Sequence, residues 1–368
     1  MRFYKEQHEF YVGIDLHARQ MYACVLNAQG ETLLHRNMPA EPEHLDRALA
    51  RFERDLVVAV ECIFTWYWIA DFCNERGIAF VLGHALYMKA IHGGKSKNDR
   101  IDSEKIASLL RAGMLPMAYV YPKQMRSTRD LLRRREYFMH QQSELLTHIQ
   151  NTNSQYNLPA FPKQIGRPGN REGLAERFED PSVRRSIQAD LDLLDVYHRL
   201  LLDLEAQVKQ QAKSHDQEAW ASNERSEWPA PVALHLLQTI PGVGKVLALV
   251  ILYETQDIRR FPQVGNFISY ARLVKCAHES AGKRTKGGHN KVGNAHLKWA
   301  FSEAAVLFLR DNEPAKRLQQ RLVSKYGKAK ALSIIAQKLG RTVYFMLKRK
   351  EPFDARRFFG DSVPELSA

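Results

Sequence analysis

Cysteine is scarce in this sequence, and the positions of the few cysteines exclude two classes of protein. The chain has 4 cysteines among 368 residues. They are Cys24, Cys62, Cys73 and Cys276. No two of them form a CxxC pair, and none stands at the spacing from a histidine that is typical of zinc ligands. The spacing therefore argues against a structural zinc site and against a disulfide scaffold, and it favours reduced thiols in the cytoplasm.

Long hydrophobic runs, a signal peptide and internal repeats are also lacking. The apolar runs are short and interrupted by polar residues, so none is long enough to cross a bilayer. Apolar residues nevertheless make up 45% of the chain, which is typical of a globular protein. We therefore expect a cytoplasmic protein that has no membrane partner.

Acidic residues are outnumbered by basic ones, and this imbalance favours a polyanionic partner. The chain has 54 Lys and Arg against 41 Asp and Glu, a net charge of +13. Nucleic acid is the simplest partner for such a charge. Charge alone fits equally well a basic protein whose charges are only solvated.

Four acids occupy positions at the ends of predicted elements. Asp15 and Glu61 each close a short apolar run that is typical of a strand. Asp99 and Asp102 open a helical pattern, three residues apart and hence on one face. Taken singly, Asp99 fits a helix cap and Asp102 fits a solvated or ion-paired residue. Together the four acids predict a metal site, because catalytic groups of α/β proteins collect at strand ends.

Carboxylate oxygens are the ligands that hard divalent cations prefer, so the predicted ion is Mg²⁺, with Mn²⁺ as an alternative. Two such ions about 3.5–4 Å apart can stabilise both the attacking and the leaving oxygen of a phosphoryl displacement. The neighbouring cations Lys95, Lys97 and Arg100 would then lie close to the phosphates of a nucleic acid.

Short β-type runs alternate with helical patterns in residues 1–122, which predicts a mixed α/β sheet with flanking helices. The expected strands are Tyr11–Ile14, Met21–Leu26, Thr32–Arg36, Leu56–Val60 and Ala79–Leu82. A helix from Pro42 to Arg54 and a Trp-rich helix ending at Arg76 are expected between them.

Helical patterns dominate the rest of the chain. A long polar helix is expected at Arg126–Tyr156, and a second helix carries an apolar stripe from Ile187 to Val208. That stripe fits a coiled-coil seam between two protomers and equally a hairpin within one chain. Helices are also expected at Lys245–Tyr253, Phe261–Leu273, Ala295–Leu309 and Lys328–Leu347.

Two features of the C-terminal part favour contacts with a nucleic-acid backbone. The turn Ile240–Gly244 resembles a helix-hairpin-helix turn, in which Gly242, Gly244 and the first helical residue, Lys245, approach a phosphate. Glycines in such turns also occur for purely steric reasons. A Gly- and Lys-rich loop follows at His278–Asn294. It carries Ser280, Lys283, Arg284, Lys286 and Lys291, of which Ser280 is a nucleophile or an ordinary loop residue.

These patterns divide the chain into an α/β domain at 1–122, a helical coiled-coil or linker region at 123–229, a mainly helical domain at 230–350 and a tail at 351–368. Taken in order, the motifs resemble DEDD-type transposases of the bacterial insertion-sequence "one-ten" family. The matching motifs are Gly13-Ile14-Asp15-Leu16-His17, Val60-Glu61, Lys97-Asn98-Asp99-Arg100-Ile101-Asp102, Ile240-Pro241-Gly242-Val243-Gly244, Ser280-Ala281-Gly282-Lys283 and Lys291-Val292-Gly293-Asn294.

The resemblance implies an N-terminal RNase H-like fold of the Holliday-junction-resolvase (RuvC-like) type, a coiled coil and a C-terminal transposase domain. It implies that Asp15, Glu61, Asp99 and Asp102 bind Mg²⁺ and that Ser280 attacks DNA to form a covalent phosphoserine. It further implies recombination between donor and target DNA by a homo-oligomer, a dimer or tetramer, with a structured guide RNA.

Three other readings stay open. The first is a metal-dependent nuclease of the Holliday-junction type that uses water as its nucleophile and leaves no protein–DNA adduct. The second is a phosphotransferase of the actin and sugar-kinase class, whose first strand also ends in Gly-Ile-Asp, although the second Gly-rich phosphate loop of that class is missing here. The third is a non-catalytic nucleic-acid-binding protein, against which the four intact acids argue.

Overall fold

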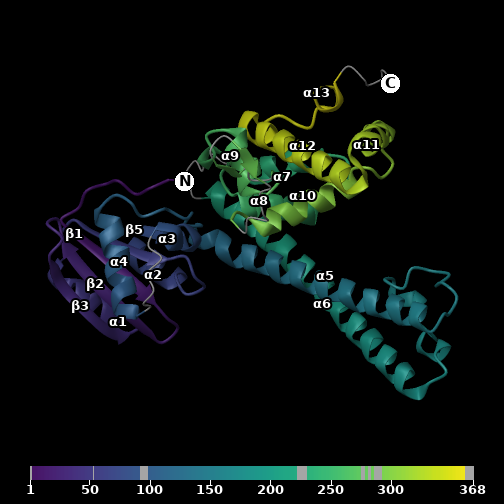
Figure 1. The fold of residues 1–368 in the computed structure, drawn as a ribbon, viewed down its shortest axis with the longest axis horizontal. Coiled ribbons are helices and arrows are strands. Elements are labelled where there is room, and N and C mark those ends of the chain that lie inside the picture. Colours follow the sequence, from purple (N-terminus) through teal and green to yellow (C-terminus); the bar gives the residue numbers. More distant parts are fainter. Residues whose placement is uncertain are drawn as a thin grey trace. The chain divides into compact units, whose positions relative to one another are not determined.

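The chain folds into two compact units in the computed structural model, Met1–Lys123 and Gln124–Ala368 (Figure 1). The structure describes residues 2–52, 54–91, 98–221, 230–274, 278–280, 283–285 and 292–360. Within these ranges, no helix is both long enough and apolar enough to span a bilayer.

The first unit is built on a five-stranded mixed sheet with the strand order β3-β2-β1-β4-β5. Its strands are β1 (Phe10–Leu16), β2 (Gln20–Asn27), β3 (Thr32–Pro39), β4 (Leu56–Glu61) and β5 (Ala79–Gly83). The first three strands form an antiparallel meander, whereas β4 pairs in parallel with β1 and β5 pairs in parallel with β4. The predicted mixed sheet is therefore confirmed.

Helices cover both faces of this sheet. They are α1 (Pro42–Leu49), α2 (Tyr67–Glu75), α3 (Ala85–Ile91) and α4 (Asp99–Arg111). Side chains of β1 alternate between the faces: Val12 and Ile14 join a core with α1 and α2, while Tyr11 packs with α4. The helix predicted for Pro42–Arg54 is shorter in the structure, because α1 ends at Leu49 and a 3₁₀ turn, Ala50–Phe52, follows.

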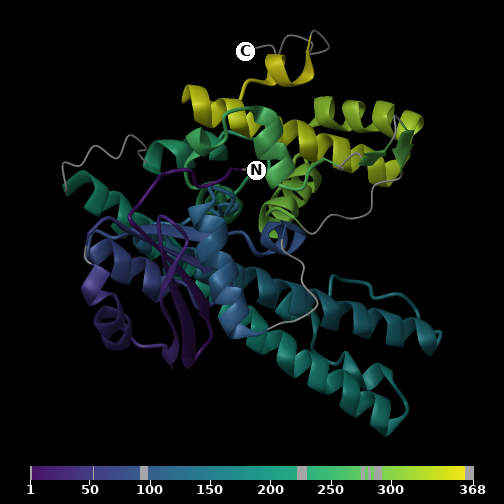
Figure 2. The same ribbon diagram turned by 60° about the vertical axis from the view of Figure 1, so that its left-hand side comes forward.

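Two long helices, α5 (Lys123–Gln155) and α6 (Pro181–Ala221), run side by side in the second unit (Figures 1 and 2). Short 3₁₀ turns at Pro168–Asn170 and Ala175–Arg177 lie between them. The apolar stripe of the second helix is buried inside this chain. Ile187, Leu191 and Leu194 form one core cluster with Ile149 of α5, and Val208 joins the larger core of the unit. The stripe thus closes a hairpin within one chain.

The remaining helices form the larger core. They are α7 (Ala230–Gln238), α8 (Lys245–Thr255), α9 (Val264–Tyr270), α10 (Ala295–Leu307), α11 (Glu313–Tyr326), α12 (Lys328–Arg349) and α13 (Ala355–Phe359). The expected helix Phe261–Leu273 is shorter than predicted, because a 3₁₀ turn at Ile258–Arg260 and an extended Phe261 come before α9. The expected loop at His278–Asn294 contains a short hairpin of β6 (His278–Ser280) and β7 (Lys283–Thr285). Helix α11 was not predicted.

Candidate functional site

Asp15 and Glu61 lie at the carboxyl ends of neighbouring parallel strands. The last paired residues of the β1–β4 ladder are Ile14 and Val60, so the next residue on each strand is an acid. Gly13 and Ala59 pair with each other on the face of the sheet that α4 covers. Asp15 follows Gly13 by two residues, and Glu61 follows Ala59 by two residues. Side chains two apart on a strand share a face, so the two carboxylates project from the same face of the sheet.

Gly13 lets α4 approach the sheet closely. A Cβ atom on Gly13 would lie 2.3 Å from the backbone nitrogen of Ala107 and 2.3 Å from the carbonyl oxygen of Ser103. No side chain fits in this space, and strand interiors use glycine where another backbone comes this near. Since Gly13 precedes Asp15 by two residues on the same face, the close packing brings the start of α4 towards the Asp15 carboxylate.

The first turn of α4 presents Asp99 and Asp102. The side chain of Asn98 caps the helix, accepting a hydrogen bond of 3.0 Å from the backbone nitrogen of Arg100, so Asp99 is not the cap. The Asp99 side chain is 61% exposed. The Asp102 side chain is partly buried, and its Oδ1 lies 3.3 Å from Nζ of Lys105. The positive end of the helix dipole stabilises both carboxylates in this turn.

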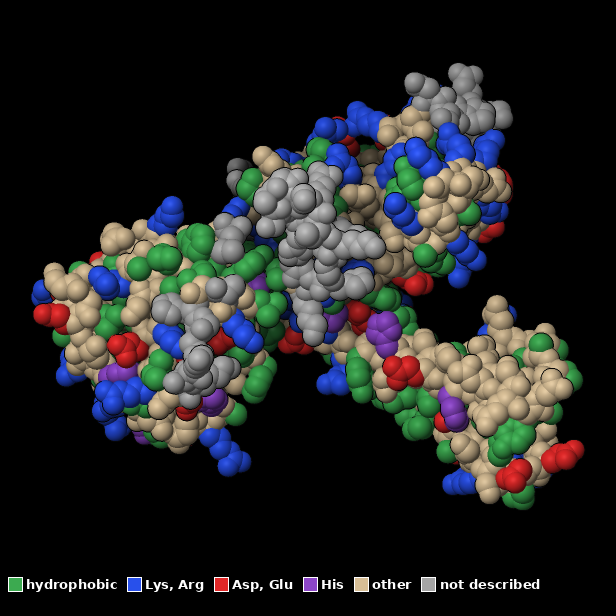
Figure 3. All heavy atoms as spheres, viewed as in Figure 1, with side chains coloured by type: hydrophobic (Ala, Val, Ile, Leu, Met, Phe, Trp, Pro, Cys, Tyr) green, Lys and Arg blue, Asp and Glu red, His purple; other side chains and the backbone are tan. Residues whose placement is uncertain are grey.

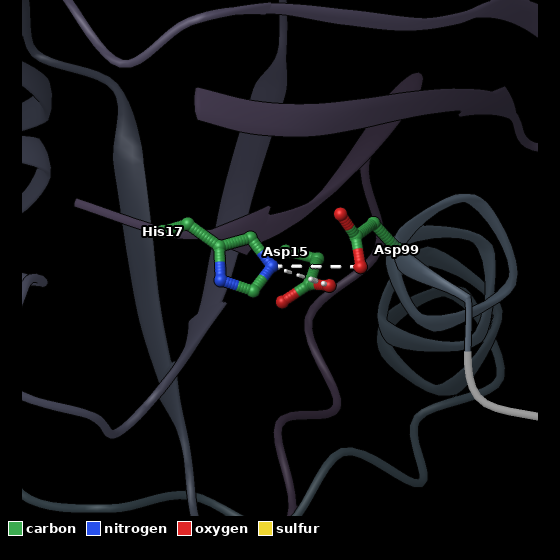
Figure 4. Close-up of side chains that lie close together, drawn as sticks. All are labelled: Asp15, His17 and Asp99. Atoms are coloured by element: carbon green, nitrogen blue, oxygen red, sulfur yellow. Dashed lines mark ion pairs between the residues drawn. The ribbon is translucent and has the colours of Figure 1, made fainter. Parts of the chain in front are cut away.

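His17 joins these acids, although the sequence analysis did not select it. Its Nε2 lies 3.5 Å from Oδ2 of Asp15 and 3.5 Å from Oδ1 of Asp99, and all three side chains point towards one another (Figure 4). Their ligand atoms lie within 4.8 Å of one another, and no other such group occurs among the described residues. The signal was present in the sequence, since His17 follows Asp15 by two residues and alternation points both to one face.

The electrostatic surroundings of Asp15 disfavour its negative charge. Burial raises the pKa of this carboxyl, the charge of His17 lowers it, and the charges of Asp99 and Asp102 raise it further. The net effect is a raised pKa. A cation between the carboxylates relieves this repulsion, and oxygen donors together with an imidazole nitrogen suit Mg²⁺ or Mn²⁺. The donor set therefore fits a divalent metal ion.

Of the three cations predicted near this site, the structure describes only Arg100. It stands beside Asp99 in the first turn of α4 and is exposed. Lys95 and Lys97 lie outside the described residues.

The two glycines of the turn before α8 have different surroundings. Gly242 has φ +80°, and a Cβ atom there would lie 2.6 Å from the carbonyl group of Leu307. Packing against α10 thus explains Gly242 without a ligand. Gly244 has no atom within 4 Å of a built Cβ, and it stands at the N-cap of α8 with no side-chain cap, next to Lys245. Only Gly244 leaves room for an approaching phosphate.

Ser280 ends strand β6, and its backbone pairs with Lys283 at the start of β7. Arg284 pairs with Glu279 in the same hairpin. Lys286 and Lys291, the other cations predicted for this loop, lie outside the described residues.

A buried ion network lies where the segment that contains Ser280 leaves and rejoins the helical core, at Tyr270 and Asn294. The backbone nitrogen of Asn294 donates to the carbonyl oxygen of Tyr270 at 2.6 Å. The Asn294 amide donates to Oε2 of Glu254 at 2.7 Å, and its Oδ1 caps α10. Arg129 and Arg133 of α5 contact the same carboxylate at 3.0 and 2.6 Å. Sequence analysis did not select this network, because its members come from helices far apart in the chain.

Glu254 keeps its negative charge in this network, although it is only 1% exposed. Burial alone raises the pKa of its carboxyl. The hydrogen bond from Arg133, the charges of Arg129 and Arg133 and the bond from Asn294 outweigh burial and lower the pKa to about 2. Glu254 is thus an ionised carboxylate whose charge the protein itself balances.

Two family models match this chain. A model of IS110 transposases with the DEDD signature, described as "Transposase", matches residues 12–157. A model described as "Transposase IS116/IS110/IS902 family" matches residues 234–320. The first match contains Asp15, Glu61, Asp99 and Asp102, and the second contains Ser280.

Two bacterial proteins are similar over most of their length. One is the "Transposase for insertion sequence element IS1111A" of Coxiella burnetii (strain RSA 493 / Nine Mile phase I), 23% identical over 93% of this chain and 90% of that protein. The other is the "Putative transposase y4qE" of Sinorhizobium fredii (strain NBRC 101917 / NGR234), 24% identical over 93% of this chain and 83% of that protein.

Proposed function

The chain belongs to the IS116/IS110/IS902 family of transposases, and we propose that it cuts and rejoins DNA with two sets of residues, one in each unit. The first set is the acidic edge: Asp15, Glu61, Asp99 and Asp102, with His17 beside them. We assign it to a catalytic domain of residues 1–122. The sheet order 3-2-1-4-5 is consistent with the RNase H-like fold of Holliday-junction resolvases.

One contact carries this proposal. Asp15, from a strand end, and Asp99, from a helix start, approach the same nitrogen of His17 at 3.5 Å. Oxygen donors from two separate elements are thus close together, and the β1–β4 register supports adding Glu61, which ends the neighbouring strand, to the proposed site. The four acids would hold Mg²⁺ or Mn²⁺, which when bound stabilises the charge that develops on phosphate oxygens. Lys95, Lys97 and Arg100 would bind the neighbouring DNA phosphates.

The second set is the serine hairpin of a transposase domain at residues 230–350. In the proposed reaction, Oγ of Ser280 attacks a DNA phosphorus as its hydroxyl loses a proton, and a serine–phosphate ester forms. The bond from phosphorus to the oxygen of the departing strand breaks, and that oxygen takes up a proton, so that the step balances. Lys283, Arg284, Lys286 and Lys291 would balance the charge on the phosphoryl oxygens. Gly244 and Lys245 would hold a further phosphate at the start of α8. The reaction requires both units, from one chain or from two, to act on the same phosphodiester.

A structured guide RNA and a homo-oligomer, a dimer or tetramer, complete the proposal. Support for an oligomer comes from α6, where Leu193, Val196 and Leu200 are 46%, 38% and 37% exposed at spacings of three and four. Such a stripe matches a coiled-coil seam. Light scattering with and without RNA tests this part, and a monomer under both conditions would contradict it.

Two variants separate the proposed reaction from its alternative. Asp102→Asn removes a charge with little change in shape, so DNA should still bind while cleavage is lost in Mg²⁺ and in Mn²⁺. Ser280→Ala should bind DNA and form neither a protein–DNA adduct nor a recombinant product. Cleavage by Ser280→Ala that leaves free ends would favour the nuclease that uses water. Full cleavage by Asp102→Asn would overturn the metal site.

A further inference from the structure

One stretch of the second unit is strongly basic. Between Pro314 and Lys350 the sequence has eleven Lys and Arg and no Asp or Glu, against a net charge of +13 for the whole protein. Helices α11 and α12 make up this stretch, and blue side chains gather over them in Figure 3.

The cations are arranged in a row and not scattered. Arg317, Arg321 and Lys325 are exposed and follow one another at intervals of four on α11, so they lie along one face of the helix. Lys328 and Lys330, also exposed, follow in the first turn of α12. We call these five residues the basic face. The three cations of α11 span about 12 Å at 1.5 Å per residue.

Cations are crowded in this region, although Arg317 also interacts with the exposed Glu313 at the start of α11. Burial and the nearby charge of Arg321 lower the pKa of Lys338 on α12. At the turn between the helices, Lys325 and Lys330 both approach the ring of Tyr326, at 5.3 and 4.7 Å from its centroid. That ring is 39% exposed. Crowded like charges destabilise a folded protein, so an external polyanion would stabilise this surface.

We propose that the basic face binds the sugar–phosphate backbone of duplex DNA outside the two reactive sites. One DNA strand carries a phosphate about every 3.4 Å of helix axis, so a row of about 12 Å faces three or four phosphates. The choice of DNA as the partner rests on the proposed function. No base-specific contact is part of the inference, since lysine and arginine rows bind phosphates without reading sequence.

The test measures binding alone, with the metal chelated, so that failure of cleavage cannot imitate failure of binding. Fluorescence anisotropy with a labelled duplex of arbitrary sequence compares the full chain with R317Q/R321Q/K325Q. The matched control, K163Q/R185Q/R199Q, removes three exposed cations from the α5–α6 hairpin. Glutamine keeps helix propensity, and circular dichroism checks the fold of each variant.

We expect R317Q/R321Q/K325Q to raise Kd at least about tenfold near physiological salt and to lower the slope of log K against log salt by about two to three. The control should change both much less, and R317K/R321K, which keeps the charge, should bind as the parent chain does. Equal losses in the triple variant and its control would overturn the proposal. So would a loss confined to structured RNA with duplex DNA unaffected.

A second measurement keeps the inference testable if the triple variant unfolds. Ser324 is exposed on α11 between Arg321 and Lys325, so Ser324→Cys with a photoactivatable label should cross-link to duplex DNA above the level of the parent chain. The same label at Ser186→Cys on α6 serves as the control. Equal cross-linking at both positions would reject the basic face.

Discussion

Two buried or half-buried carboxylates, one in each unit, have opposite surroundings. Glu254 is surrounded by Arg129, Arg133 and Asn294, and its pKa falls to about 2. Asp15 is surrounded by other aspartates and one imidazole, and its pKa is raised. The protein thus balances the charge of one acid and leaves the other unbalanced.

The difference distinguishes a structural acid, Glu254, from the proposed metal ligand, Asp15. A buried carboxylate that meets two guanidinium groups and an amide needs no ligand, and it joins α5 to the helices around α8. A carboxylate that faces like charges destabilises the fold unless a cation comes in from solution. The raised pKa of Asp15 therefore supports the proposal that the acidic edge binds a cation.

The largest expected effect is on catalysis by Asp15→Asn. Loss of one ligand should reduce metal-dependent cleavage at least about a thousandfold, because a bound metal contributes several kcal/mol of transition-state stabilisation. The same change removes a repulsive charge, so the metal-free variant should melt no lower than the parent chain. Cleavage assays and calorimetry check both, with Asp46→Asn, an exposed acid paired with Arg76, as the control. A strongly destabilised Asp15→Asn would contradict the comparison.

Glu254→Gln should have the opposite signature. It removes the charge of the carboxylate that the buried Arg129 and the partly buried Arg133 both contact, which we expect to cost about 3 kcal/mol of the free energy of unfolding. The unfolding transition of the second unit, followed by chemical denaturation of the full chain, measures this loss. Glu313→Gln, which disrupts an exposed pair with Lys316, is the matched control and should leave the transition unchanged. An equally small effect at both positions would show that the Glu254 network is not structural.

Gly13→Ala should loosen the acidic edge without touching a carboxylate. Its Cβ atom would overlap the backbone of α4 at 2.3 Å, so the helix must shift, at about 1–3 kcal/mol. Asp99 and Asp102 move with the helix, so metal affinity should fall too. Gly265→Ala, where nothing lies within 4 Å, is the control for an added methyl group. Unchanged metal affinity in Gly13→Ala would show that the packing of α4 against Gly13 does not position the acidic edge.

The smallest effect is the pH dependence of the two carboxylate variants. The folded pKa of Glu254 lies below its ordinary value of 4.5, so its stabilisation is present above that pH and is lost as the pH falls towards about 2. The folded pKa of Asp15 lies above its ordinary value of 3.8, so its penalty in the metal-free protein sets in as the pH rises above 3.8. In acid, the loss of unfolding free energy in Glu254→Gln and the gain of unfolding free energy in Asp15→Asn should therefore both become smaller. Differences that stay constant with pH would contradict these assignments.

Much of the first unit could be predicted from sequence. Its strands are apolar runs with sharp polar ends, so their positions and the convergence of acids at strand ends follow from local patterning. His17 was missed because its alternation with Asp15 does not by itself distinguish a ligand from a solvated histidine. Its role depends on the close approach of α4, which Gly13 permits.

The second unit was harder to predict, because its informative contacts are distant in the chain. Glu254 meets Arg129 across 125 residues, and no periodicity connects them. Helix α11 was missed because it has few apolar side chains, and Ala315 is its only buried residue. The hairpin at Ser280 has strands of three residues rich in polar side chains, which read as loop.

Calorimetric melting of the metal-free protein with increasing Mn²⁺ or Mg²⁺ tests the central claim most directly. A cation that binds only the folded protein raises the melting temperature of the protein, and the rise grows with the logarithm of the cation concentration once this exceeds Kd. We predict a metal-dependent rise for the parent chain and for Glu254→Gln, and none for Asp15→Asn or Asp99→Asn. An equal rise in the parent chain and in Asp15→Asn would contradict the assignment of the acidic edge as the metal site.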